Sequence, residues 1–162
     1  MATRVLMVCL GNICRSPMAA AVLDNRARTA GVDVVVASAG TAAWHAGEGP
    51  NPMSEQVWSE AGYRYTHIAQ QFSPHMFDEY DYILVMDQSN FRNVLAQAQS
   101  AQDSQKVRYL RSFDSALTHV DQQSEEAHQL FVPDPWQQPQ EEFQKVLAMI
   151  ERSVDGLLEV IR

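Results

Sequence analysis

The chain has 162 residues, enough for one domain with a substantial core, and its 46% hydrophobic and 20% charged residues are ordinary for a globular protein. The formal net charge is −8 and the 12 Lys and Arg residues form no cluster, which argues against nucleic acid as a partner. No apolar run reaches the roughly 18 residues of a membrane span, and the first run is too short for a signal peptide. We therefore expect one domain over residues 1–162, in the cytoplasm, with its two cysteines reduced.

Short apolar runs alternate with segments of helical period along the chain. The predicted strands are RVLMVC (4–9), VDVVVASAG (32–40), DYILVMD (81–87) and KVRYL (106–110), and the predicted helices cover 16–30, 53–61, 89–100 and 141–161. This alternation is typical of an α/β fold, so we expect a twisted, parallel, four-stranded sheet with helices on both faces. Ligands of such sheets bind beyond the carboxyl ends of the strands, which directs attention to the loop after residue 9.

The loop in MVCLGNICRSP (7–17) has the features of an anion site. We expect Ser16 to cap the following helix and Pro17 to occupy its first position. The loop would then present free main-chain N–H groups at the positive end of the helix dipole. Gly11 and Asn12 are the residue types that best tolerate the left-handed backbone of such a cradle.

Two side chains indicate that this loop catalyses a reaction and does not only bind an anion. Cys9 would be the nucleophile, since helix N-termini and arginine favour the reactive thiolate. Arg15 can hold two phosphate oxygens in bidentate fashion, and the Ser16 hydroxyl can donate to the sulfur. The pattern predicts phosphoryl transfer through a phosphocysteine. We expect no metal or other cofactor, because the amides and Arg15 would stabilise the developing charge.

The motif VCLGNICRSP resembles the signature of the low-molecular-weight protein tyrosine phosphatases, and the resemblance covers nearly the whole chain. It implies a four-stranded parallel sheet, with Cys9 as nucleophile and Arg15 as phosphate clamp. The phosphate-binding residues that it implies are Leu10, Gly11, Asn12, Ile13, Cys14, Arg15 and Ser16. It also implies that Asn12 holds the shape of the loop through a network with Ser16, Ser38 and His67.

Asp134 in VPDPW is the expected general acid and base. The flanking prolines stiffen the segment, and the resemblance implies that this aspartate protonates the leaving phenolate, which favours an acidic to mildly acidic optimum. Trp136 beside it and Trp44 in GTAAWHAGEG are the expected walls for a flat ring. The apolar Ile13 also favours an aromatic substrate, and a deep pocket favours phosphotyrosine over phosphoserine.

Three further features of the sequence bear on the resemblance. The resemblance implies that Cys14 can form a reversible disulfide with Cys9, which would protect the nucleophile from further oxidation. Gln70 stands where many relatives have an arginine, so a positive charge near the loop is missing. Residues 111–132 form a longer and more polar connection to Asp134 than the family pattern has, and this connection could alter partner choice.

Four alternative functions remain to be weighed. A thioredoxin-coupled arsenate reductase needs further cysteines after Cys14, and none follows. A protein-arginine phosphatase would have threonine in place of Ile13. A phosphocysteine carrier would lack both Arg15 and a general acid, and a non-catalytic phosphotyrosine reader would not need nucleophile, clamp and acid together. We expect a monomer whose partner is a phosphotyrosine-containing protein, with a tyrosine kinase among the candidates.

Overall fold

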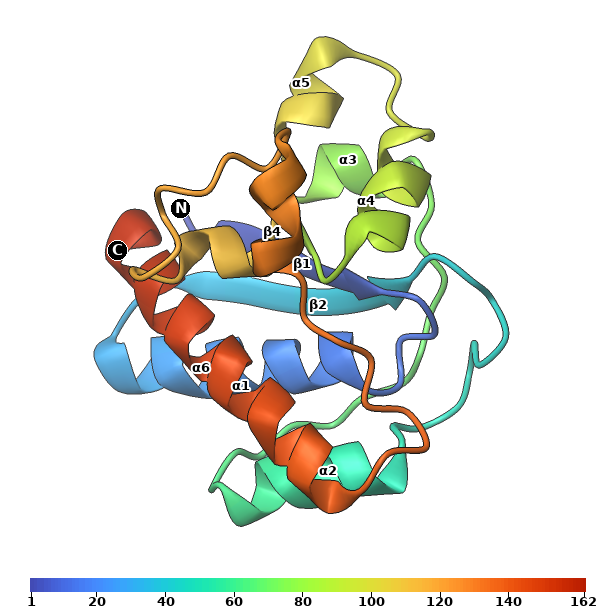
Figure 1. Cartoon of the computed structure of the whole chain (residues 1–162), viewed down its shortest axis with the longest axis vertical. Coiled ribbons are helices and arrows are strands. Elements are labelled where there is room, and N and C mark those ends of the chain that lie inside the picture. Colours follow the sequence, from blue (N-terminus) through green and yellow to red (C-terminus); the bar gives the residue numbers. More distant parts are fainter.

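The computed structural model describes all residues from 1 to 162, and a parallel sheet of four strands lies at its centre (Figure 1). The strands are β1 (Thr3–Cys9), β2 (Val34–Gly40), β3 (Tyr82–Val85) and β4 (Val107–Tyr109). The helices are α1 (Arg15–Ala30), α2 (Pro52–Glu60), α3 (Met76–Glu79), α4 (Gln88–Leu95), α5 (Ala101–Gln105) and α6 (Gln140–Ile161), with short 3₁₀ helices η1 (Leu110–Phe113) and η2 (Glu125–Leu130). The α/β fold expected from the sequence is confirmed.

The order of the strands is β2-β1-β3-β4, so the chain moves from β1 to one neighbour and later returns to the other side. This reversal makes the space between β1 and β3 the switch point of the sheet. The loop that follows β1 at Cys9 leaves the sheet at this point. The topology therefore places residues 10–14 where open α/β sheets bind their ligands.

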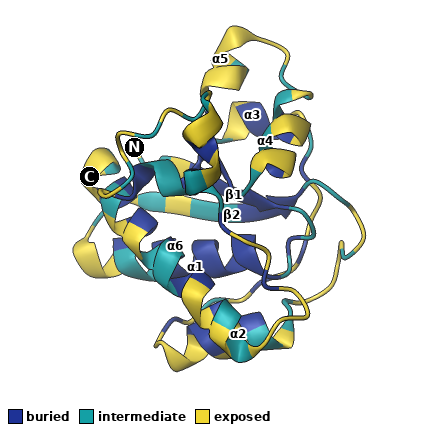
Figure 2. Cartoon of the chain, viewed as in Figure 1, coloured by how far each residue is buried: buried dark blue, intermediate teal, exposed yellow.

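Helices cover both faces of the sheet (Figures 1 and 2). Helices α1, α2 and α6 pack on one face over Val5, Met7 and Leu84, whereas α3, α4 and η2 pack on the other face over Leu6 and Ile83. Neighbouring residues of β1 thus point to opposite cores, and both are fully buried, which is why RVLMVC is a continuous apolar run.

The last helix, α6, covers the predicted range 141–161 and has one apolar stripe. The stripe consists of Phe143, Val146, Leu147, Ile150, Val154, Leu157 and Leu158, all of which are buried. Gly156 lies on this helix where it crosses η1, and a Cβ atom there would lie 1.7 Å from the carbonyl oxygen of Phe113. Only glycine allows so close a contact. None of the helices has both the length and the apolar character of a membrane span.

Several element boundaries differ from the prediction. The helix predicted over 89–100 ends at Leu95, and a separate short helix, capped by the Ser100 side chain, follows in the polar segment 97–105. The strand predicted over 32–40 begins at Val34. The aperiodic stretch 112–132 contains the end of η1 and all of η2, and such short 3₁₀ turns leave no clear hydrophobic period.

Candidate active site

The loop after β1 forms a cradle of unused main-chain donors. The N–H groups of Gly11, Ile13, Cys14, Arg15 and Ser16 donate no hydrogen bond within the protein. Asn12 is the loop residue with a left-handed backbone (φ 58°), whereas Gly11 does not have a positive φ, contrary to the prediction. A main chain that exposes consecutive N–H groups at a helix N-terminus suits an anion with several oxygens.

The predicted cap of the helix after this loop is wrong. Helix α1 begins at Arg15, and Cys14 at the N-cap position makes no side-chain capping bond. Ser16 lies inside the helix, and its hydroxyl is 3.0 Å from the sulfur of Cys9 and accepts from Asn12 Nδ2, so it does not cap the helix end. The orphan N–H groups of α1 remain free for a ligand.

The sulfur of Cys9 is surrounded by donors. Besides Ser16 Oγ, the main-chain N–H of Asn12 donates to Sγ at 3.3 Å. The side chain of Asn12 fixes the direction of the serine contact, because its Nδ2 donates to Ser16 Oγ at 2.7 Å and leaves the hydroxyl proton for the sulfur. Hydrogen bonds to a sulfur atom favour its anionic form, so this surrounding suits a thiolate.

Asn12 ties the loop to the rest of the molecule. Its Nδ2 also donates to Ser38 Oγ at 2.9 Å, and its Oδ1 accepts from the main chain of Gln70 at 2.9 Å. The ring of His67 lies 2.6 Å, through Nε2, from the carbonyl oxygen of Asn12. Since a carbonyl only accepts, this nitrogen carries a proton. Asn12, Ser16, Ser38 and His67 are thus brought together, and all four are buried.

Gln70 stands where the sequence indicated a missing charge. It contributes two neutral bonds, since its main-chain N–H reaches Asn12 and its side-chain amide donates to the carbonyl of Ser38 at 3.0 Å. The segment that carries Gln70 is extended and lies beside Gly40, the last residue of β2. The loop is supported here by hydrogen bonds and not by a charge.

The guanidinium of Arg15 is buried, and one of its two terminal nitrogens is hydrogen-bonded within the protein. Its Nη1 donates to Asp87 Oδ2 at 2.7 Å and to the carbonyl of Val132 at 2.9 Å. Its Nε and Nη2 make no hydrogen bond, and Nη2 lies 3.7 Å from Asp134 Oδ2. Burial disfavours the charge, but the Cys9 thiolate, Asp87 and Asp134 outweigh it and raise the pKa of Arg15. The Nε and Nη2 atoms of this permanently charged guanidinium are therefore free to bind two oxygens of a phosphate.

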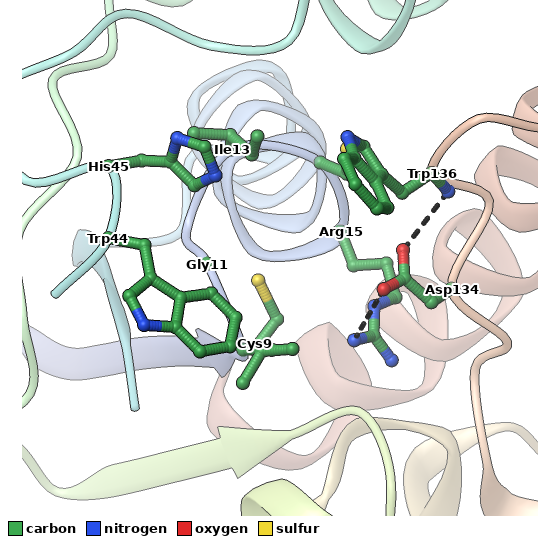
Figure 3. A pocket seen from close by; sticks show the side chains of 10 residues that line it. Cys9, Gly11, Ile13, Arg15, Trp44, His45, Asp134 and Trp136 are labelled. Carbon is green, nitrogen blue, oxygen red and sulfur yellow. Dashed lines mark hydrogen bonds and ion pairs between the residues drawn. The ribbon is translucent and has the colours of Figure 1, made fainter. Parts of the chain in front are cut away.

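A pocket of about 110 Å³ opens above the loop (Figure 3). It is lined by Cys9, Leu10, Gly11, Ile13, Cys14, Arg15, Trp44, His45, Asp134 and Trp136. Trp136 and Trp44 are half or more exposed and lie on opposite sides of Cys9. The carboxylate of Asp134 accepts from the main-chain N–H of Trp136 at 3.1 Å, which holds it at the rim.

Two residues near the pocket were missed by the sequence analysis. Asp87 follows β3 at its carboxyl end, caps α4 through a bond from Asn90, and anchors Arg15. The rule that directed attention to the end of β1 could have found it. His45 follows Trp44 and packs over Gly11, where a Cβ atom would lie 3.2 Å from the imidazole. No sequence pattern singles out this histidine.

The buried His67 makes stability depend on pH. Burial, partly offset by the bond to Asn12, lowers the pKa of His67 from its ordinary value of 6.5. As the pH falls below 6.5, His67 becomes protonated in the unfolded chain but stays neutral in the folded chain. The free energy of unfolding therefore decreases. We expect urea unfolding to show a steeper loss of stability between about pH 7 and pH 5 in the wild type than in His67→Gln. Parallel pH profiles would contradict this role.

Asp87 is expected to position Arg15 for phosphate. Asp87→Asn keeps the helix cap but removes the charge that faces Nη1, so inorganic phosphate should inhibit about tenfold more weakly and KM should rise more than kcat falls. Competitive inhibition of hydrolysis measures this. Asp78→Asn, an exposed site without an ion pair, is the matched control. A kcat loss at unchanged phosphate affinity would contradict a positioning role.

Comparisons with known proteins agree with this geometry. The model of the family "Low molecular weight phosphotyrosine protein phosphatase" matches residues 4–162. The low molecular weight protein-tyrosine-phosphatase of Streptomyces coelicolor is 40% identical over 100% of this chain and 95% of its own length. The low molecular weight phosphotyrosine protein phosphatase of Sus scrofa is 31% identical over 98% of this chain and 95% of its own length.

Solved structures show the same fold. A protein tyrosine phosphatase from Entamoeba histolytica has a TM-score of 0.85 at 28% identity and covers 98% of this chain and 96% of its own. A low molecular weight phosphotyrosine phosphatase from Vibrio cholerae has a TM-score of 0.83 at 30% identity, with the same coverage of both chains. The fold and these relatives define the class as protein-tyrosine phosphatases. The chain belongs to the low molecular weight phosphotyrosine protein phosphatase family.

Proposed function

We propose that the protein hydrolyses phosphotyrosine in proteins through a phosphocysteine at Cys9. The observation that carries this proposal is that Cys9, Arg15 and Asp134 line one pocket, although 119 residues separate the arginine from the aspartate (134 − 15). The pocket combines a nucleophile, an oxyanion clamp and a proton donor. Family membership supports the same reaction.

The first step transfers the phosphoryl group to sulfur. The thiolate of Cys9 attacks phosphorus while the bond to the tyrosine oxygen breaks, and Asp134 gives its proton to the departing phenolate. The free edge of Arg15 and the unused N–H groups of residues 11–16 hold the equatorial oxygens. The products of this step are the dephosphorylated tyrosine side chain of the substrate protein and the phosphocysteine.

The second step releases phosphate. Asp134, now a carboxylate, takes a proton from a water molecule as the water oxygen attacks phosphorus. The sulfur of Cys9 leaves as a thiolate, which the donors from Ser16 and Asn12 stabilise. Inorganic phosphate departs and the site returns to its initial state.

The proposed preference for phosphotyrosine rests on the depth of the pocket and on the side chains that form its walls. Cys9 is 2% exposed, so the phosphate must travel to the floor of the pocket to meet it. A phenol ring supplies this length between the walls formed by Ile13, Trp44 and Trp136, whereas a phosphoserine side chain is shorter. We therefore propose phosphotyrosine, and not phosphoserine, as the substrate.

The direct test is the hydrolysis of three substrates. Purified protein should release phosphate from p-nitrophenyl phosphate and from a phosphotyrosine peptide, and it should leave the matched phosphoserine peptide intact. Release from none of them, at protein concentrations where phosphate still binds, would indicate a reader and would overturn the proposal. Preferential hydrolysis of phosphoarginine would favour the rival phosphatase.

Cys14 is proposed as a redox partner of the nucleophile. Both cysteines are free and buried, and burial and the charges of Cys9 and Asp134 raise the pKa of Cys14 to about 12, so its thiol is protonated at rest. Peroxide oxidises the Cys9 thiolate to a sulfenic acid. The Cys14 sulfur then attacks the oxidised sulfur, its proton leaves with the hydroxyl as water, and a disulfide forms.

Thiol reductants should therefore restore activity after peroxide treatment in the wild type. The same reductants should restore almost none in Cys14→Ser, where the sulfenic acid continues to sulfinic acid. Activity measured before peroxide, after peroxide and after reductant separates recovery from initial loss. Equal recovery in both proteins would contradict the disulfide.

The remaining parts of the proposal concern context. We propose that residues 1–162 act as one phosphatase domain and as a monomer, that the reduced cysteines reflect a cytoplasmic location, and that a tyrosine kinase is among the substrates. Capture of phosphoproteins on the Cys9→Ser variant would identify the substrates.

A further inference from the structure

We propose that Glu48 selects phosphotyrosine substrates that carry lysine or arginine beside the phosphotyrosine. The inference rests on the proposed function and names a specificity-determining residue for it. Glu48 lies outside the loop of residues 9–16 and is not needed for the reaction itself. What it supplies is a fixed negative charge beside the entrance of the pocket.

Glu48 is held in place by three contacts. Its main-chain N–H donates to the carbonyl of His45 at 2.9 Å, and its carbonyl accepts from the N–H of Ala69 at 2.8 Å. The carboxylate accepts from His45 Nδ1 at 3.2 Å. The neighbouring Gly47 donates to the carbonyl of Ala69 at 2.8 Å, so residues 47–48 are bonded to the segment that also supports the phosphate loop. The carboxylate is therefore positioned, although its side chain is 59% exposed.

His45 connects this carboxylate to the pocket. Its ring lines the cavity beside Ile13 and packs over Gly11 (Figure 3). Because a carboxylate only accepts, Nδ1 carries a proton in this contact. The contact holds the negative charge of Glu48 against the wall that contains His45.

The opposite wall adds no positive charge. Asp134 lies there beside Trp136 with its side chain 43% exposed. Arg15 is the cation of the pocket. It is 2% exposed and bound to Asp87, so it can bind the phosphate at the floor but cannot contact the residues beside the phosphotyrosine. The rim therefore has the negative charge of Glu48 beside it, while the positive charge of Arg15 lies at the floor.

A peptide that inserts its phosphotyrosine leaves the flanking residues at this rim. An extended chain advances about 3.3 Å per residue, so the adjacent side chains remain within reach of Glu48. Lysine or arginine there meets an exposed carboxylate, and glutamate there meets like charge. The net charge of −8 adds long-range attraction for a basic peptide.

The test compares three phosphotyrosine peptides that differ only in having lysine, alanine or glutamate on both sides of the phosphotyrosine. For each protein, kcat/KM of the peptide is divided by kcat/KM of p-nitrophenyl phosphate, which has no flanking residues. At an ionic strength of about 0.01 M we expect the lysine peptide to exceed the glutamate peptide by about fivefold or more. The ratio should shrink at about 0.1 M, where the Debye length falls to about 10 Å.

Glu48→Gln should reduce this preference by about threefold, and Glu48→Lys should bring it to one or reverse it. Glu159→Gln, which makes the same charge change on α6 beside a cavity lined by Arg26 and Arg162, is the matched control and should keep the wild-type ratio. Equal kcat/KM values for the three peptides, or equal effects of the two Gln variants, would overturn the role of Glu48 alone. Absence of any hydrolysis of p-nitrophenyl phosphate would instead overturn the proposed function, and this inference with it.

Discussion

Replacement of Cys9 by serine is expected to lower kcat for a phosphotyrosine peptide by at least about 10⁴-fold while phosphate binding persists. A serine hydroxyl must lose a proton before it can attack phosphorus, and the groups that face this position cannot take it. The N–H of Asn12 and the hydroxyl of Ser16 are both donors toward the sulfur. Such donors can stabilise a sulfur anion, but they cannot take the proton from a serine hydroxyl.

Three measurements check this expectation. Steady-state kcat gives the loss, phosphorus NMR of acid-quenched enzyme shows phosphocysteine in the wild type but not in the variant, and calorimetric titration gives phosphate affinity. Cys14→Ser is the matched control, since it makes the same atomic change five residues away, and it should lose less than about tenfold. A Cys9→Ser protein that retains a tenth of the wild-type kcat would refute the phosphocysteine.

The second large effect is expected at Asp134. Asp134→Asn cannot donate a proton to the leaving oxygen, so kcat/KM for phenyl phosphate should fall by about 10²- to 10³-fold. The loss for p-nitrophenyl phosphate should be much smaller, because p-nitrophenolate is a weak base that leaves without help. With a series of aryl phosphates, log kcat/KM should therefore depend more steeply on the basicity of the leaving group in Asp134→Asn than in the wild type.

Asp134 also lies 3.7 Å from Arg15, so its replacement could act through the clamp. Inhibition by inorganic phosphate separates the two effects, because a proton donor can be removed at nearly constant phosphate affinity. Asp78→Asn again serves as the control. An Asp134→Asn protein with uniform losses for all leaving groups would show that this aspartate is not the acid.

The fold was predictable because its signals are local. A continuous apolar run predicts each buried strand, the alternation with helical segments predicts the parallel sheet, and the stripe on α6 predicts its buried face. The position of the site followed from the end of β1 alone. These inferences need no knowledge of which distant residues meet.

The contacts that complete the site are of another kind. Arg15 meets Asp87 across 72 residues and the carbonyl of Val132 across 117 residues. No spacing rule in a single sequence can pair such residues. The long polar connection of residues 111–132 therefore has a structural role, because the carbonyl of its last residue, Val132, accepts a hydrogen bond from Arg15.

The error at Ser16 has an instructive physical reason. Serine followed by proline is a sound capping signal, but a capping oxygen must accept from the N–H groups of the helix end. Here the helix already begins at Arg15, and Ser16 Oγ accepts from Asn12 Nδ2 and lies 3.0 Å from the sulfur of Cys9. Local rules fail where a side chain is used for chemistry in place of helix capping. The same reasoning applies to Asn12, whose left-handed backbone serves the shape of the loop.

The distribution of the three tryptophans turns the site into an optical reporter. Trp44 and Trp136 are exposed on the two sides of the pocket, whereas Trp58, a residue of α2, is buried. Emission from the first two should respond whenever an aromatic ester slides between them, and Trp58 provides a constant background. Occupancy of the cleft can thus be followed in real time without any attached dye.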